Sequence, residues 1–96
     1  MPFVSTDATL IAKRREGVVA RRLGPSCVLV NLTTNDIFEL NETGGRIWEL
    51  LEQNASVQDI TERLVDEFDV DYDDCLQETA ELLNQLQAQG LAEFSR

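Results

Sequence analysis

The chain contains no histidine among its 96 residues. Histidine is the commonest general base and metal ligand in proteins, and it activates serine and cysteine nucleophiles. Its absence therefore excludes the usual histidine-dependent hydrolytic sites. The sequence also lacks the phosphate-binding, dinucleotide-binding and zinc-protease motifs. We predict that the protein is not an enzyme and has no catalytic residues and no cofactor.

Cysteine is almost as scarce. Cys27 and Cys75 lie far apart in the sequence, and neither belongs to a Cys-x-x-Cys pair. A closed zinc site needs four ligands, so two thiols hold a metal only if two chains share it. We interpret both cysteines as small buried side chains of a protein in a reducing compartment, and we predict no metal site.

The sequence has no long hydrophobic segment. No apolar run approaches the roughly 18 residues of a membrane-spanning helix, and nothing near Met1 resembles a signal peptide. We therefore expect a cytoplasmic protein with no membrane partner.

Basic residues are few and unevenly placed. The chain has 8 lysines and arginines against 18 acidic residues, and its net charge is −10. Residues 1–30 carry a charge of +3, whereas residues 31–96 carry −13. Residues 1–16 show no sustained hydrophobic period, so we predict a flexible basic lead-in, followed by a domain over residues 17–96.

Three short runs of apolar and β-branched residues predict strands at residues 18–23, 27–32 and 37–40. The dipeptide Gly24-Pro25 separates the first two runs, and the polar loop 33–36 separates the next two. Both are strong turn signals. The pattern predicts a three-stranded antiparallel meander.

Apolar residues at helical spacing predict three helices in the rest of the chain. Asn41 or Thr43 caps the first helix, and Ser56 caps the second. Glycines in the first turn of the first helix, Gly44 and Gly45, allow a close approach to the sheet. The predicted class is thus α+β: a small winged-helix-like domain with a three-stranded antiparallel sheet followed by three helices.

The third helix is expected to end at Gly90, and Leu91 and Phe94 then fold back as an apolar clasp.

Winged-helix domains often place a helix in the major groove of DNA. Here that helix carries several acidic residues and no lysine or arginine before Arg96, so it would repel phosphates. We predict no nucleic-acid partner.

The predicted strand at residues 37–40 lies at one end of the meander. An edge strand has a row of unpaired N–H and C=O groups to which an extended peptide can add as a further strand. The final helix is expected beside this edge, so that a cleft with an apolar floor and an acidic rim lies between them. Because an open edge also permits self-pairing, the sequence leaves the oligomeric state open, with a homodimer as one alternative.

Two segments resemble the PqqD family. They read LN-x-TG-x-x-IW-x-LL at residues 40–51 and S-V-x-x-I-x-x-x-L at residues 56–64, and the likeness extends over about residues 17–94. Proteins of this family are similar to RiPP recognition elements, which are small winged-helix domains that bind the leader part of a ribosomally made precursor peptide. The resemblance implies a peptide chaperone that presents this leader to a modifying enzyme, a radical SAM protein or another RiPP maturase.

The resemblance also implies where the peptide binds. It places the leader along the third strand and against exposed positions of the last helix. The implied peptide-binding residues are Ile37, Phe38, Glu39, Leu40, Cys75, Glu78, Thr79, Leu82 and Gln85.

The pathway stays open at this point. Members of the pyrroloquinoline quinone pathway tend to carry Pro-Glu-Gly at the hairpin, where this chain has Thr34-Asn35-Asp36. A lasso-peptide or other radical-SAM system fits as well. The alternative function is a protein-interaction adaptor or regulator of the same fold that binds a folded partner through its acidic helix.

Overall fold

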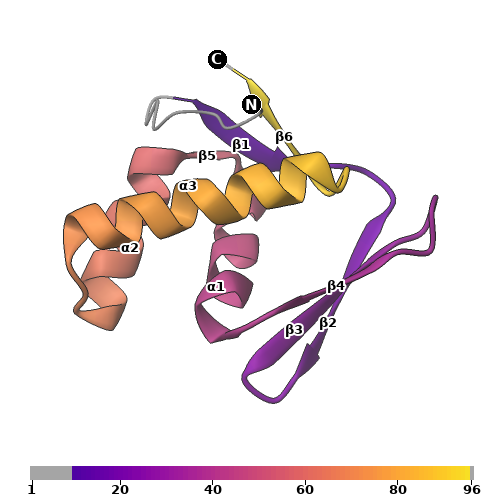
Figure 1. Ribbon diagram of the computed structural model, residues 1–96, viewed down its shortest axis with the longest axis horizontal. Coiled ribbons are helices and arrows are strands. Elements are labelled where there is room, and N and C mark those ends of the chain that lie inside the picture. The colour runs from indigo at the N-terminus through magenta and orange to yellow at the C-terminus, as the bar shows by residue number, and fades with distance from the viewer. Residues whose placement is uncertain (1–9, 96) are drawn as a thin grey trace.

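The computed structural model describes residues 10–95 of the chain. The larger of two sheets is an antiparallel meander in which the strands lie side by side in chain order. It is visible at the lower right of Figure 1. Its strands are β2 (Val18–Leu23), β3 (Ser26–Asn31) and β4 (Ile37–Leu40). The predicted meander is confirmed, although β3 ends one residue earlier than expected.

Asn31 organises the hairpin between β3 and β4. Its side-chain oxygen accepts hydrogen bonds from the backbone N–H groups of Thr33 (2.9 Å) and Thr34 (3.3 Å). Its own backbone N–H donates to the carbonyl oxygen of Asp36 at 2.9 Å. Asn35 has a φ of 66°, a left-handed conformation that asparagine tolerates better than most residues. These contacts fix the register of the two strands.

Three α-helices follow, joined by short connections. They are α1 (Glu42–Leu50), α2 (Val57–Phe68) and α3 (Tyr72–Ala88), with the one-turn 3₁₀ helix η1 (Leu51–Gln53) after α1. A side chain caps each α-helix by accepting a hydrogen bond from the backbone N–H three residues later. The caps are Asn41, Ser56 and Asp71. The first helix is thus capped by Asn41 rather than Thr43, and the predicted α+β class is confirmed.

Glycine permits a close contact between α1 and the meander. A Cβ atom at Gly45 would lie 3.3 Å from the Cβ of Cys27 on β3. A Cβ atom at Gly44 would lie 3.2 Å from the Cβ of Leu40 on β4. The expected close approach is therefore confirmed, and it sets the end of β4 directly against the start of α1.

A second small sheet was not anticipated. Its strand order is β5-β1-β6, and its strands are β1 (Ile11–Arg14), β5 (Ala55–Ser56) and β6 (Ala92–Ser95). The expectation of a flexible lead-in over residues 1–16 is therefore wrong for β1, whereas residues 1–9 lie outside the described residues. Of the four β1 side chains only that of Ala12 is buried. The strands that pair with β1 come from distant parts of the chain, so the local hydrophobic periodicity does not predict this strand.

The end of the chain also differs from the expected clasp. Gly90 ends α3 with a φ of 75°, as expected, and the N–H of Leu91 donates to the carbonyl of Leu86 at 2.8 Å. Leu91 is buried. The next residues, however, form β6 and pair with β1 along four positions. Phe94 thus makes the expected apolar contact with the core, but as a residue of a strand.

Arg14 joins the small sheet to α1. Its Nη2 and Nε atoms donate to the carbonyl oxygen of Trp48 at 2.7 and 3.1 Å. Its guanidinium also lies 4.7 Å from the centroid of the Trp48 ring, within the range of a cation–π contact. The buried indole is therefore covered by a residue of the first described strand.

An ion pair on the surface joins α1 to α2. The Nε and Nη2 atoms of Arg46 each donate to one carboxylate oxygen of Glu67 at 2.8 Å. These hydrogen bonds and the positive charge of Arg46 hold the pKa of Glu67 below its ordinary value.

We expect Glu67→Gln to lower the free energy of unfolding by about 0.5 kcal/mol at neutral pH, because it removes a partly exposed ion pair. The pKa of Glu67 is lower in the folded than in the unfolded state. The contribution is therefore complete above the unfolded pKa, about 4.3 for glutamate, and is lost as pH falls through the folded pKa. Urea unfolding at neutral and strongly acidic pH measures this difference.

Glu62→Gln is the matched control, since Glu62 lies on the same helix and contacts Gln58 rather than an arginine. A Glu67 variant with the same pH profile of stability as the Glu62 variant would contradict the role of the ion pair.

Candidate functional site

The outer edge of β4 is open within residues 10–95, because β4 pairs only with β3. Residue pairs of an antiparallel ladder alternate between hydrogen-bonded and non-hydrogen-bonded. Asn31 donates to Asp36 on the β4 side, and Leu32 donates to Gly17 on the β2 side. With the register of β3 and β4, this alternation directs the backbone N–H and C=O groups of Ile37 and Glu39 away from β3. We call these four groups the open edge of β4.

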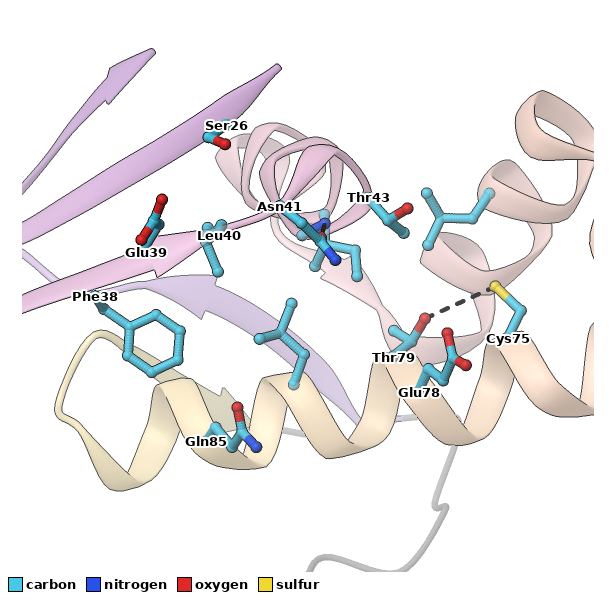
Figure 2. A pocket seen from close by; sticks show the side chains of 14 residues that line it. Ser26, Phe38, Glu39, Leu40, Asn41, Thr43, Cys75, Glu78, Thr79 and Gln85 are labelled. Carbon is cyan, nitrogen blue, oxygen red and sulfur yellow. Dashed lines mark hydrogen bonds between the residues drawn. The ribbon is translucent and has the colours of Figure 1, made fainter. Parts of the chain in front are cut away.

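A groove of about 490 Å³ runs between this open edge and α3. Figure 2 shows β4 above α3, with the Phe38 ring pointing from the strand toward the helix. Glu39 lies on the opposite side of β4 from Phe38. Residues of β3, β4, α1 and α3 line the groove together with Leu64 of α2.

The structure brings the residues implied by the family resemblance together. Eight of the nine line the groove: Phe38, Glu39, Leu40, Cys75, Glu78, Thr79, Leu82 and Gln85. Ile37 does not line it; its side chain is 70% exposed on the other face of the sheet. Its backbone N–H and C=O groups, in contrast, form part of the open edge of β4.

The lining residues differ in exposure. Glu39, Glu78 and Gln85 are exposed and form a polar rim, whereas Phe38 and Leu82 are half-buried. Leu40 is only 2% exposed and belongs to the core that supports the groove. A peptide in the groove would therefore contact an apolar wall and an acidic rim.

Two α3 positions that the family resemblance implied to be exposed are buried, and the burial of Cys75 confirms the interpretation of both cysteines as small buried side chains. Cys75 is 6% exposed and Thr79 is 1% exposed. The Sγ atom of Cys75 lies 3.9 Å from the Oγ1 atom of Thr79, a contact marked by the dashed line in Figure 2. It also donates to the carbonyl oxygen of Thr61 at 4.0 Å. Each of the two side chains therefore has a hydrogen-bond partner although it is buried. Both positions lie on the buried face of α3, so the two side chains form the floor of the groove.

Burial raises the pKa of the Cys75 thiol. The thiol is therefore protonated at neutral pH, and a protonated buried thiol is a weak nucleophile and a weak metal ligand. Among residues 10–95 no group of three or more cysteine and carboxylate side chains is placed to hold a metal ion. Cys75 acts in this groove as a small apolar surface.

Six further lining residues were not anticipated as part of the site: Ser26, Asn41, Thr43, Gly44, Ile47 and Leu64. Ser26, Asn41 and Thr43 line the groove at the end near α1. Asn41 is engaged as the cap of α1, with its side-chain oxygen 2.8 Å from the N–H of Gly44. The sequence marked this residue as a cap and as part of the segment that resembles the PqqD family, but not as a lining residue. Its position beside the groove follows from the direct passage of β4 into α1.

The part of the chain that the structure describes has no helix long and apolar enough to cross a membrane.

Comparisons with known proteins identify domains similar to this chain. The family model for coenzyme PQQ synthesis protein D (PqqD) matches residues 26–92. A solved structure of TbiB1 in complex with the TbiA(beta) leader peptide is similar, with a TM-score of 0.78 and 30% sequence identity. It covers 84% of this chain and 94% of that chain.

A second solved structure is lasso peptide synthetase B1 complexed with the leader peptide. It has a TM-score of 0.76 and 23% identity, and it covers 85% of this chain and 96% of that chain. At this identity the likeness shows a shared fold. No curated protein gives a significant match.

Proposed function

The chain belongs to the PqqD family, and from this we propose that it binds the leader segment of a ribosomally made precursor peptide. The leader adds as a strand to the open edge of β4 and lies in the groove against α3. The complex then presents the rest of the precursor to a modifying enzyme, a radical SAM protein or another RiPP maturase.

The observation that carries the proposal is the open edge of β4 beside an apolar groove. Backbone hydrogen bonds to Ile37 and Glu39 provide affinity for any extended peptide. The half-buried side chains of Phe38 and Leu82 add contacts that depend on the peptide sequence. TbiB1, which is 30% identical to this chain, was solved in complex with a leader peptide, and this supports the same class of ligand here.

The proposed role is binding and presentation without catalysis. Holding the leader on a domain that also contacts the enzyme raises the effective concentration of the precursor near the active site. We place this function in the cytoplasm, in pyrroloquinoline quinone biosynthesis or another pathway of ribosomally made peptides. No cofactor is needed for such a role.

The test is an NMR titration of the labelled protein with the leader segment of a precursor peptide encoded beside its gene. We expect saturable shifts at residues 37–40 and along the 75–85 face of α3. Binding without shifts at these residues, or no saturable shifts at all, would contradict the proposal and favour the adaptor function.

A pair of leucine variants sharpens the result. Leu82→Ala is expected to weaken leader binding about tenfold, or about 1.4 kcal/mol, because it removes a side chain from the groove wall. Leu76→Ala is the matched control, since Leu76 is also a half-buried leucine of α3 but does not line the groove. Equal losses of affinity in the two variants would show that the effect comes from stability.

A further inference from the structure

The outer face of the meander, opposite the helices, carries two rows of side chains across the strands. The strand register aligns Val19, Val30 and Ile37 in one row. Val19 is 47% exposed and Ile37 is 70% exposed, so this row is an apolar stripe that ends at the open edge of β4.

The second row lies two residues along the strands. It consists of Arg21 on β2, Val28 on β3 and Glu39 on β4. Glu39 therefore ends this row at the same open edge where Ile37 ends the apolar row. A strand added to β4 extends both rows by one residue each, because side chains on one face of a sheet lie opposite each other.

The carboxylate of Glu39 has no partner within residues 10–95. No hydrogen bond or ion pair joins it to another described residue, whereas other surface glutamates such as Glu49 and Glu67 are paired with arginines. Arg21, the cation of its row, is two strands away, or about 10 Å. The nearest unfilled position for a cation is therefore on an added strand.

The groove itself offers no competing positive charge. Glu39 and Glu78 are its only charged lining residues, and neither a lysine nor an arginine of the described chain lines it. An acidic side chain on the peptide at this position would face like charge directly opposite, which destabilises a strand pair.

We propose that the leader carries a lysine or arginine beside Glu39 and an apolar residue beside Ile37, two positions apart, with a groove-facing residue between them. This inference deepens the proposed function and rests on it. The spacing follows from the sheet alone and holds for either direction of the added strand, which decides only whether the cation precedes or follows the apolar residue. The in-between side chain points to the helix side and contacts Phe38 and Leu82.

The experiment is a selection from a displayed library of random linear peptides on three forms of the full chain. The forms are wild type, Glu39→Lys and Glu52→Lys. Glu52 is an exposed glutamate that does not line the groove, so its variant has the same change in net charge away from the site.

We expect wild type and Glu52→Lys to enrich peptides with a lysine or arginine two positions from an apolar residue. Glu39→Lys is expected to enrich aspartate or glutamate at that same position and to keep the other preferences. For one selected peptide made with lysine or glutamate there, the preference is expected to reverse from about fivefold one way to about fivefold the other.

The selection distinguishes a failure of the proposed function from a failure of the inference about the cation. If wild type enriches no peptides, or only peptides that leave the NMR signals of β4 unchanged, the proposed function is wrong. If it enriches strand-forming peptides whose charge preference Glu39→Lys does not alter, the function stands and the inference about the cation is overturned.

Discussion

Glu39→Pro is expected to weaken leader binding at least tenfold while leaving the protein folded. Proline has no N–H to donate, and its ring occupies the space that an added strand needs. Because the N–H of Glu39 points away from β3, its loss breaks no hydrogen bond within the sheet, and proline is tolerated at such positions of edge strands. Isothermal titration calorimetry with the leader peptide measures the loss.

Two controls isolate the backbone effect. Ala20→Pro removes an outward N–H from the other edge of the same sheet, since the alternation along β2 directs the backbone of Ala20 away from β3. It is expected to bind the leader with unchanged affinity. Glu39→Ala removes the carboxylate but keeps the N–H, and we expect a smaller loss than with proline. Equal affinities of the Glu39→Pro variant and wild type would rule out strand addition at β4.

Trp48→Ala is expected to have the largest effect on stability, a loss of about 3–5 kcal/mol in the free energy of unfolding. Trp48 is 2% exposed, and its removal leaves a large cavity and ends the cation–π contact with Arg14. Domains of this size are stable by only about 5–15 kcal/mol, so the variant is close to unfolding. Trp48 is the single tryptophan of the chain, so its removal also removes the tryptophan fluorescence that would report unfolding. Urea unfolding is therefore followed by circular dichroism.

Arg14→Ala separates the two contributions. It removes the hydrogen bonds to the Trp48 carbonyl and the cation–π contact but leaves the indole in place. We expect a loss of about 1–2 kcal/mol. If Arg14→Ala costs as much as Trp48→Ala, then the attachment of β1 rather than the packing of the indole dominates stability.

The meander and the helices could be predicted because their signals are local. Turn residues such as Asn35 and caps such as Ser56 act within a few positions of their own place in the chain. The small sheet could not be predicted in the same way. Its strands are short and its pairings join residues near 11, 55 and 95, so no sequence window contains two partners.

The elements that form the groove could be predicted from the sequence, but the burial of individual side chains on α3 could not. Edge position and sequence resemblance together brought β4 and α3 to one groove. The rotation of α3 about its own axis, however, decides which of its side chains are buried. The structure leaves Leu76 half-buried and buries Cys75 and Thr79, two positions that the resemblance implied to be exposed. Their small side chains fit where α3 lies close to α2, and this tertiary fit has no periodic signature.

The pairing of β1 with β6 affects how the chain folds as it is synthesised. Ile11 lies opposite Ser95, whereas each strand of the meander finds its partner within a short stretch of sequence. Contacts between distant residues form late, because a long loop must close before they are made. β1 therefore leaves the ribosome well before its main partner exists. A nascent chain that stops before β6 leaves β1 with only the two-residue β5 as a partner, so the small sheet is complete only after β6 has been synthesised.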